Sequence, residues 1–361
     1  TMNLLAPLLQ NPQYEIRLLT GPQKKAVAEA VGFQVLPILE GHEKEFEKAA
    51  NNKEQLGIFS AYRQLSASLD LINLVSDQLI QEWTNHRPDI VIVDFITLSG
   101  GLVANQLGIP WITTMATQFV LETTDGPPCF IGGMGSPKNF WQATIQFLGR
   151  KATRIVKRIV SFSFRNRLKR YKFKLYNQLG HETIYSRDSI LAIGMKEVEL
   201  KKGFPEHFRW VGPSGASVEA GEDYPLDLTP FRERKKILVT CGTQLGWAKE
   251  NLIYQAKQLA KAHPDCHFFV TRGVGGEAFQ CENLMENLSL VSYLPYKEYI
   301  PKMDYVIHHG GAGIFYQCII YGKPALILPH DYDQFDYAVR GVEAGVAFTA
   351  KRDNSKTIGQ S

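Results

Sequence analysis

The chain has 361 residues, of which 44% are hydrophobic and 21% are charged, and its formal net charge is +4. This length allows two α/β domains with separate cores, and the composition is ordinary for a soluble globular protein. No run of about 18 apolar residues is long enough to span a bilayer, and no signal peptide is evident. The five cysteines are odd in number and form no CxxC pair, which favours buried thiols over disulfides or metal ligands. We therefore expect a cytoplasmic protein.

The first half of the chain alternates between strand and helix patterns. Expected strands cover residues 15–20, 89–94 and 109–114, and expected helices cover residues 22–31, 61–84 and 98–107. The stretch 89–94 (DIVIVD) is a continuous apolar run, typical of a parallel strand that is buried on both faces. This alternation predicts an α/β fold with a doubly wound parallel sheet.

A basic segment follows these elements. Between Gly126 and His181 there is no acidic residue, but there are twelve Lys and Arg. Apolar side chains are interleaved with the basic ones, namely Phe140, Trp141, Ile145, Phe147, Leu148, Ile155, Ile159, Val160, Phe162 and Phe164. The mixture indicates an amphipathic element over residues 138–174 that meets an anionic membrane surface, although a solvated helix face is the plainer alternative. Nucleic acid is a poorer partner, because no nucleic-acid motif accompanies the charge.

Residues 213–234 interrupt the pattern. They are rich in Pro, Gly, Ser and acidic residues, and we interpret them as a linker between an N-terminal domain (residues 1–212) and a C-terminal domain (residues 235–361). A second alternation then begins, with expected strands at 236–241, 267–271, 289–293, 304–308, 325–329 and 346–349, and expected helices at 249–262, 313–321 and 334–344.

The pattern of expected elements is incomplete at both ends of the chain. The first residues show a helical pattern (Leu4, Leu5, Leu8, Leu9) that leads to the strand at 15–20. A parallel βαβ unit needs a strand before that helix, so we expect a further strand ahead of Thr1 and further sequence after Ser361.

The most informative motif is His309-Gly310-Gly311-Ala312-Gly313, which lies between an expected strand and an expected helix. Glycines at that junction direct free backbone N–H groups and a helix N-terminus to one place, which is an anion site. The pair Asp333-Gln334 follows the next strand, and adjacent strand ends form a ligand crevice in open α/β sheets. The layout predicts a phosphate-bearing ligand with a polar group attached.

With these motifs the chain resembles the nucleotide-sugar glycosyltransferases of the GT-B fold, in particular the UDP-glucuronosyl/glucosyltransferases and bacterial macrolide-type enzymes of family 1. The resemblance covers nearly the whole chain and is strongest from Ser289 to Gly345. It implies two Rossmann-like doubly wound domains that face each other across a cleft. The N-terminal domain would hold the acceptor, and the C-terminal domain would hold a UDP- or dTDP-sugar as co-substrate, with no further cofactor and no metal.

The resemblance assigns roles in donor binding. The family's motif His, which contacts the α-phosphate, corresponds to His309, and the amides of Gly310, Gly311, Ala312 and Gly313 would hold the diphosphate. Gly242-Thr243-Gln244 resembles the second phosphate loop, where Thr243 would bind the β-phosphate. In the aromatic-x-Pro motif, Tyr293 would stack on the base and the Leu294 backbone would bind its edge. Asp333-Gln334 matches the pair that binds the sugar hydroxyls.

Two positions depart from the family pattern. Gln317 stands where the family usually carries the Glu that binds the ribose hydroxyls, so a charge-assisted bond is lost. The family is inverting and uses a His oriented by a strand-end Asp as the base. Asp94 matches the Asp, whereas the His is expected immediately before Thr1 and is absent from the sequence.

Each of these residues also has a structural interpretation. Asp94, Thr243 and Asp333 are ordinary helix caps or loop residues, Tyr293 suits a core, and Gln317 suits a solvated helix face. The cluster His308, His309, His330, Asp331 and Asp333 raises the alternative of a metal site, but it lacks HxH or HExxH spacing.

The reaction that we predict is transfer of a hexose to a hydroxyl of a hydrophobic or lipid-like acceptor by an inverting, metal-independent transferase. A non-catalytic donor-binding protein is the main alternative, favoured by Gln317 and by the absent His. A sugar-nucleotide epimerase is disfavoured because it would not need the basic, aromatic segment. A dehydrogenase is disfavoured because no GxGxxG follows an expected strand.

Overall fold

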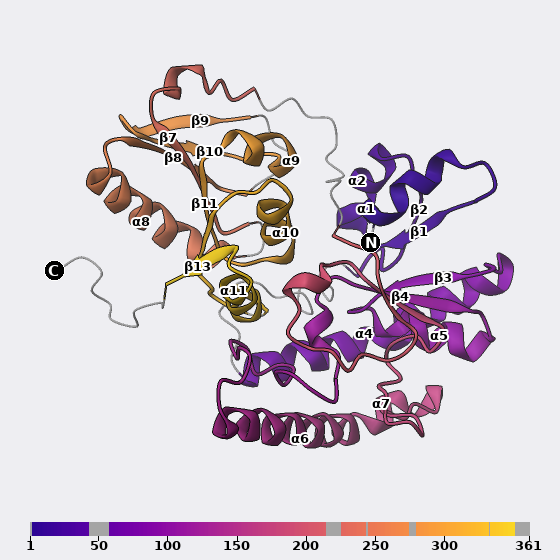
Figure 1. The fold of residues 1–361 in the computed structure, drawn as a ribbon. Coiled ribbons are helices and arrows are strands. Elements are labelled where there is room, and N and C mark those ends of the chain that lie inside the picture. The colour runs from indigo at the N-terminus through magenta and orange to yellow at the C-terminus, as the bar shows by residue number, and fades with distance from the viewer. Residues whose placement is uncertain are drawn as a thin grey trace. The chain divides into compact units, whose positions relative to one another are not determined.

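The computed structural model describes residues 2–42, 58–213, 225–242, 245–273, 279–331 and 333–350. The described residues form two compact units (Figure 1). The first unit contains residues up to 213 except the short stretch 132–135, and the second contains that stretch and the residues from 225 onward.

The first unit has two parallel sheets. Strands β1 (Arg17–Thr20) and β2 (Gln34–Pro37) form one. The other has the order β3-β4-β5-β6, with β3 (Val91–Asp94), β4 (Trp111–Met115), β5 (Ser189–Ala192) and β6 (Phe208–Trp210). The sequence predicted β1, β3 and β4 to within two residues and missed the other three strands. These have only three or four residues, too few for a periodic pattern.

The first unit also contains α-helices. They are α1 (Met2–Leu5), α2 (Lys25–Ala30), α4 (Ile58–Asn85), α5 (Leu98–Leu107), α6 (Phe140–Ser163) and α7 (Arg165–Leu168). Helices α4 and α5 share a core with the sheet, built from residues such as Leu79, Val103 and Trp111. An ideal Cβ on Gly101 would lie 2.4 Å from the Trp111 ring, so the small residues of α5 allow it to pack closely on β4.

The second unit is built on one seven-stranded sheet with the order β13-β12-β11-β7-β8-β10-β9. Its strands are β7 (Lys235–Thr240), β8 (Cys266–Thr271), β9 (Cys281–Met285), β10 (Leu288–Val291), β11 (Tyr305–His308), β12 (Ala325–Ile327) and β13 (Ala347–Thr349). All neighbours are parallel except β9 and β10, which are antiparallel. The sequence predicted every strand of this sheet except the antiparallel edge strand β9, each to within two residues.

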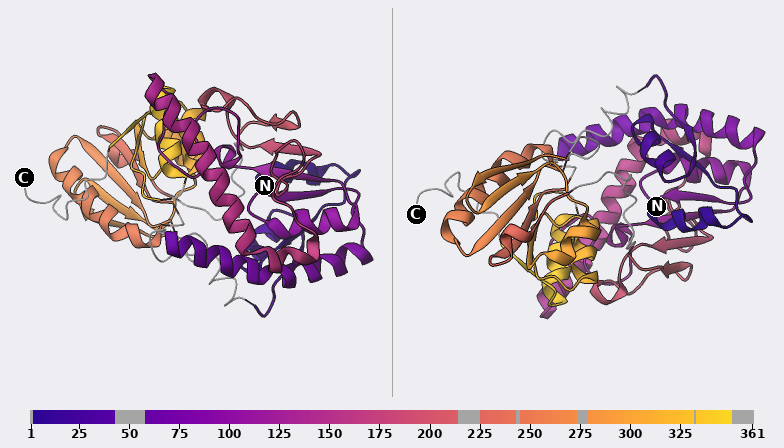
Figure 2. Two further views of the ribbon diagram at one scale, coloured as in Figure 1. Left: turned by 90° about the horizontal axis from the view of Figure 1, so that it is seen from below. Right: turned by 90° about the horizontal axis from the view of Figure 1, so that it is seen from above.

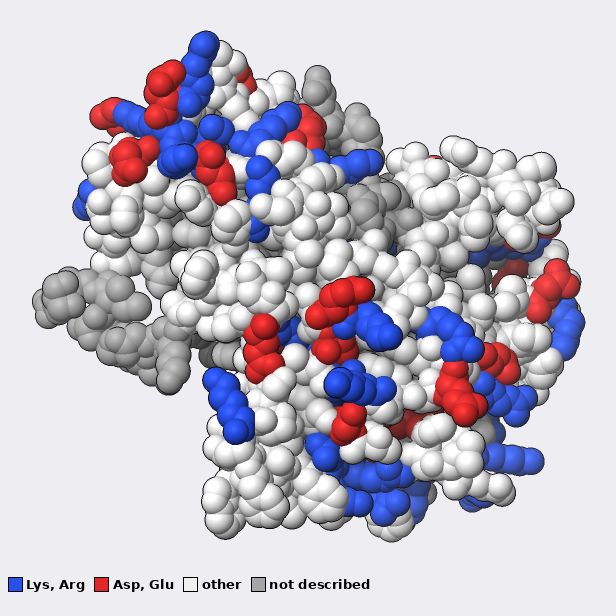
Figure 3. All heavy atoms as spheres, viewed as in Figure 1, with Lys and Arg blue, Asp and Glu red and all other residues white. Residues whose placement is uncertain are grey.

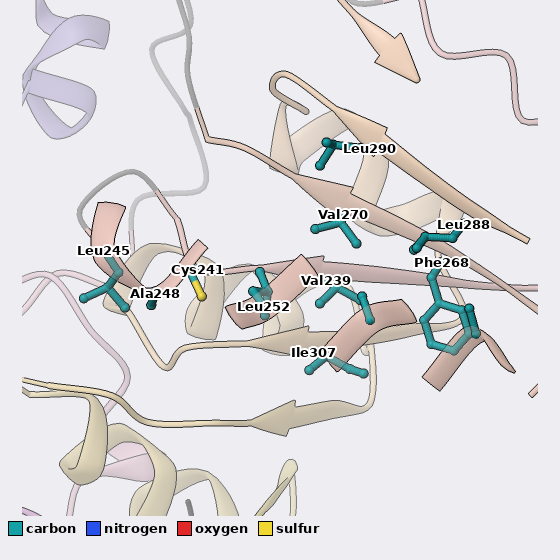
Figure 4. Close-up of a cluster of buried hydrophobic side chains, with 12 residues drawn as sticks. Val239, Cys241, Leu245, Ala248, Leu252, Phe268, Val270, Leu288, Leu290 and Ile307 are labelled. Atoms are coloured by element: carbon teal, nitrogen blue, oxygen red, sulfur yellow. The ribbon is translucent and has the colours of Figure 1, made fainter. Parts of the chain in front are cut away.

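Helices α8 (Lys249–Ala262), α9 (Tyr296–Tyr299), α10 (Ala312–Ile320) and α11 (Gln334–Glu343) complete the second unit. Figure 4 shows the apolar core in which side chains of the central strands, such as Val239, Phe268 and Leu288, pack with Leu252 of α8. The first strand, β7, has β8 on one side and β11 on the other, so the strand order reverses at β7 and β11. Ligands of doubly wound sheets bind at the carboxyl ends of the strands at this switch point.

Candidate functional site

The ends of β7 and β11 bring the two glycine loops together. Thr240 is paired with His308 in the parallel register, so Gly242 and His309 follow neighbouring strand ends. An ideal Cβ on Gly242 would lie 2.8 Å from Cε1 of His309, and Gly242 has a φ of +66°. The His309 ring therefore packs directly on Gly242, and a side chain at that position would displace it.

The turn after His309 requires its first glycine. Gly310 has a φ of +94°, and an ideal Cβ there would lie 2.9 Å from Cγ2 of Ile327 and 3.0 Å from the carbonyl oxygen of Gln334. Helix α10 begins at Ala312, and its N-cap, Gly311, supplies no side-chain hydrogen bond. The N-cap side chain therefore does not occupy the first amides of α10, and the anion site that the motif predicts there stays a prediction.

His308 is a buried part of the turn. Its Nδ1 accepts a hydrogen bond of 3.0 Å from the Gly310 amide, and burial, followed by the neighbouring His309, lowers its pKa to about 3. The imidazole is thus neutral, with Nδ1 as the acceptor. His308 is therefore a packed residue at the end of β11.

His309 presents an incomplete set of hydrogen bonds. Burial and then His330 lower its pKa to about 4, while a hydrogen bond with the Thr240 main chain acts in the opposite direction. Its Nδ1 is buried and has no hydrogen-bond partner among the described residues. A buried polar atom without a partner is unfavourable, so this nitrogen, beside the glycine turn, suits a ligand oxygen.

A hydroxyl network that the sequence analysis missed shapes the loop after β7. Thr271 Oγ1 donates to Thr240 Oγ1 at 2.8 Å, the same oxygen accepts the Gly242 amide at 2.9 Å, and Tyr296 Oη lies 3.2 Å away. Thr240 and Thr271 are partners in the β7–β8 register. The sequence signal for this network is a Thr at the end of each of two strands. Whether the two residues are partners depends on the strand register, which the sequence alone does not show.

The residues expected to bind sugar lie where α11 begins. Oε1 of Gln334 accepts the amides of His330 at 2.8 Å and Asp331 at 3.1 Å, which fixes the loop after β12. Gln334 is 4% exposed, and both of these hydrogen bonds use its Oε1 rather than its Nε2. Asp333 is the N-cap residue of α11, but its side chain makes no capping hydrogen bond. Capping therefore does not account for the Asp333 carboxylate.

The other described donor residues follow β10 or lie on α10. Tyr293 and Leu294 follow the end of β10; Tyr293 is half-buried, and Leu294 is buried. Gln317 lies on α10 and is 6% exposed, so the alternative of a solvated side chain is wrong. Thr243 and Gln244 lie outside the described residues.

Asp94 belongs to the first unit and ends β3. Its Oδ1 lies 3.4 Å from the Ile96 amide, and its carbonyl oxygen accepts the Thr97 amide at 2.8 Å. The half-buried carboxylate therefore sits in the turn that leads into α5. This is the strand-end position that the sequence predicted, and its catalytic role stays a hypothesis.

The first unit also contains a pocket of about 370 Å³. Cationic side chains of α6, Arg150, Lys151 and Arg154, line it together with the carboxylates Glu122 and Glu182. None of the expected donor residues contributes to it, and neither does Asp94. Because charged side chains line the pocket, we do not assign it as the site of a hydrophobic acceptor.

No group of three or more His, Cys, Asp or Glu among the described residues is arranged to hold a metal ion. None of the described helices is both long and apolar enough to cross a bilayer.

Known proteins that resemble this chain include glycosyltransferases. Residues 275–360 match the family described as erythromycin biosynthesis protein CIII-like, C-terminal domain. The chain is 22% identical to 4'-demethylrebeccamycin synthase of Lentzea aerocolonigenes, over 97% of this chain and 85% of that protein. It is also 22% identical to UDP-glucuronosyltransferase 3A2 of Homo sapiens, over 99% of this chain and 73% of that protein.

Solved structures share the fold. The glycotransferase of kitacinnamycin superposes with a TM-score of 0.68 at 17% identity, covering 97% of this chain and 81% of that one. The glycosyltransferase VinC in complex with DTDP gives a TM-score of 0.61 at 18% identity, covering 97% and 83%. The chain therefore has the GT-B fold and resembles the macrolide-type and UDP-glucuronosyl/glucosyltransferases of family 1. Glycosyltransferase activity with a nucleotide-sugar donor is the activity that these similarities support.

Proposed function

We propose that this chain is an inverting glycosyltransferase that moves a hexose from a UDP- or dTDP-sugar to a hydroxyl of a hydrophobic or lipid-like acceptor. The observation that carries the proposal is the meeting of His309 and Gly242 at the switch point of the seven-stranded sheet, beside the uncapped start of α10. Such an edge suits a diphosphate, because backbone amides and a helix N-terminus stabilise negative charge.

The leaving diphosphate gains charge as the glycosidic bond breaks. The amides from Gly310 to Gly313 and the N-terminus of α10 would stabilise this charge without a metal. His309 would add a hydrogen bond from the nitrogen that has no protein partner. A hydroxyl and an amide from Thr243 would hold the β-phosphate.

The transfer step is a displacement at the anomeric carbon. The acceptor oxygen would form a bond to this carbon while the bond to the diphosphate oxygen breaks on the opposite face, which inverts the centre. The acceptor proton would pass to the His expected before Thr1, and Asp94 would orient that base. The place of Asp94 at the carboxyl end of β3 supports this role.

The nucleoside would lie against the residues after β10. Tyr293 would stack on the base, the Leu294 backbone would bind its edge, and Gln317 would bind the sugar of the nucleoside. VinC, which shares the fold, was crystallised in complex with DTDP, so both UDP and dTDP are candidates. A neutral Gln317 binds hydroxyls without the charge assistance of a Glu.

The transferred sugar is assigned to Asp333 and Gln334, and kinetics with and without sugar test this assignment. We expect Asp333→Asn and Gln334→Glu to reduce turnover at least tenfold while the affinity for free UDP changes little. Gln334→Glu keeps an oxygen for the two loop amides and removes only the Nε2 donor, so it separates binding from folding. Equal losses of turnover and UDP affinity would refute the sugar contact.

A donor-binding protein without transferase activity is the second candidate, and Gln317 favours it. Assays with a panel of hydrophobic acceptors separate the two functions, since the second candidate predicts nucleotide binding without product. We also propose that the enzyme meets its acceptor at the cytoplasmic face of a membrane.

A further inference from the structure

Helix α6 is arranged opposite to an ordinary surface helix, with polar groups toward the protein and apolar groups toward solvent. Its only buried residues are Gln146 and Thr153. Among its apolar side chains, Ile145, Leu148 and Ile159 are 55%, 59% and 62% exposed. A surface helix of a globular protein normally buries its apolar stripe.

Polar contacts fix the inner face of α6. The Thr153 hydroxyl donates to the carbonyl oxygens of Gly149 at 2.9 Å and Cys129 at 3.3 Å. Lys157 Nζ lies 2.6 Å from Glu182 Oε1, and Arg154 donates to the Gly180 carbonyl oxygen at 2.9 Å. Because these contacts hold one side against the unit, the opposite side is held outward.

The outer side is a continuous apolar stripe. Its members recur at intervals of four and three residues along one face, and they are Trp141, Ile145, Leu148, Ala152, Ile155, Ile159 and Phe162. All seven are exposed. At 1.5 Å per residue the stripe is about 32 Å long. Single exposed apolar residues are normal on a protein surface, but a row of this length indicates an interaction site.

A row of positive charge runs beside this stripe. Lys151 and Arg158 are seven residues apart on α6, and Arg165 is the first residue of α7; all three are exposed, and no ion pair joins them to an acidic residue in the part of the chain that the structure describes. They belong to the segment from Gly126 to His181, which has twelve basic residues and no acidic one. Figure 3 shows Lys and Arg side chains gathered in the lower part of the view, where Figure 1 places α6 and α7.

We infer that α6 is a docking helix for an anionic lipid surface, lying in the plane of the interface with its apolar stripe inserted. The left view of Figure 2 shows α6 as one unbroken helix, as such a role requires. An outward apolar face with Lys and Arg at its edge is the pattern of interfacial helices. The inference rests on the surface of α6 and does not depend on the proposed transferase activity.

Other occupants fit the same surface less well. Two copies of α6 face to face would bring together two acid-free basic segments, and like charges repel. A nucleic acid would find its phosphates opposed by the apolar stripe. An anionic bilayer satisfies both features at once, because its acyl region receives Trp141 and Ile155 while its headgroups meet Lys151 and Arg158.

Vesicle flotation with the full chain tests the inference. We expect the wild type to bind phosphatidylcholine vesicles that contain about 30% phosphatidylglycerol, and to bind them more weakly in high salt. The double variant Lys151→Glu/Arg158→Glu should bind about 25-fold more weakly than the wild type. Ile155→Glu/Ile159→Glu should abolish binding. Tyr254→Glu and Lys261→Glu, on exposed positions of α8, are the matched controls and should bind like the wild type.

Three outcomes would overturn the inference. They are failure of the wild type to bind anionic vesicles at low salt, unchanged binding by the two α6 variants, and equal loss in the α8 controls. Light scattering of the same proteins identifies self-association. A wild-type dimer that Ile155→Glu/Ile159→Glu converts to monomer, without vesicle binding, would assign the stripe to a second copy instead. Circular dichroism of each variant establishes that it is folded.

Discussion

The two units place their polar side chains in opposite ways. In the second unit, histidines and hydroxyls gather at the carboxyl ends of β7, β8 and β11, beside an apolar core. In the first unit, polar groups lie beneath α6, and apolar side chains cover its outer face. We interpret the buried polar groups of the second unit as the proposed site for a small polar ligand, and the exposed apolar groups of the first unit as the proposed docking surface.

Acid should weaken the second unit more than the first, and this is the largest effect that we expect. Burial lowers the pKa of His267 and His309 to about 4 and that of His308 to about 3. The unfolded chain takes up these protons near pH 6.5 and the folded chain does not. Stability is therefore present above pH 6.5 and falls from there to about pH 4 for His267 and His309 and to about pH 3 for His308. At pH 5 the loss is about 2 kcal/mol for each histidine, or about 6 kcal/mol as an upper limit.

Hydrogen exchange of the amides in β7, β8 and β11 at several pH values measures this loss. His308→Asn keeps an acceptor for the Gly310 amide and removes one titrating group, so the slope should decrease by about one proton. A slope that does not change on this substitution would contradict the assignment of the pKa shift to burial of His308.

Removing a charge beneath α6 should destabilise the first unit. Glu182 is buried and paired with Lys157 at 2.6 Å, and Glu122 lies 3.2 Å from the same nitrogen. Lys157→Met leaves these carboxylates in a low-dielectric site, and we expect a loss of about 3 kcal/mol in the free energy of unfolding. Urea unfolding measures it, with Lys302→Met as the control, because the exposed pair with Glu298 should contribute less than about 1 kcal/mol. Equal effects would show that the inner face of α6 is solvated.

The glycine turn should tolerate a methyl group at one position and not at another. Gly310→Ala requires an alanine with a positive φ, and its Cβ would lie 2.9 Å from Ile327. We expect the free energy of unfolding to fall by about 2 kcal/mol and the affinity for nucleotide to be lost as well. Gly313→Ala is the matched control: it meets no atom within 4 Å and lies in α10, so it should be neutral or stabilise by up to about 1 kcal/mol. Thermal unfolding compares the two, and similar losses would refute the packing explanation.

The sequence predicted the second unit better than the first for a physical reason. Central parallel strands such as β7 and β8 contain the apolar runs 237–239 and 268–270, which suit a sheet that is covered on both faces, and they have turn signals beside them. Strands β5 and β6 carry no such signal, since they are short and β6 contains an exposed Arg209. Their places depend on pairings between residues that lie far apart in the chain.

The candidate site was predictable to a similar degree. The motif placed His309 and the glycines, because a strand, a glycine turn and a helix are local features. The network of Thr240, Thr271 and Tyr296 was not predictable, because it depends on the β7–β8 register and on α9. For α6, the interleaved apolar and basic residues indicated an amphipathic element, but the outward stripe is defined only by the helix itself and by the contacts of Thr153 and Lys157 on its inner face.

Calorimetric titration of the chain with UDP, dTDP, GDP and ADP, without added metal, is the decisive test of the donor site at the switch point. We expect that UDP or dTDP binds and that His309→Ala abolishes this binding, while His263→Ala, at an exposed position after α8, leaves it unchanged. Failure of every nucleotide to bind, or binding to a folded His309→Ala protein with unchanged affinity, would contradict the assignment of the switch point as the donor site.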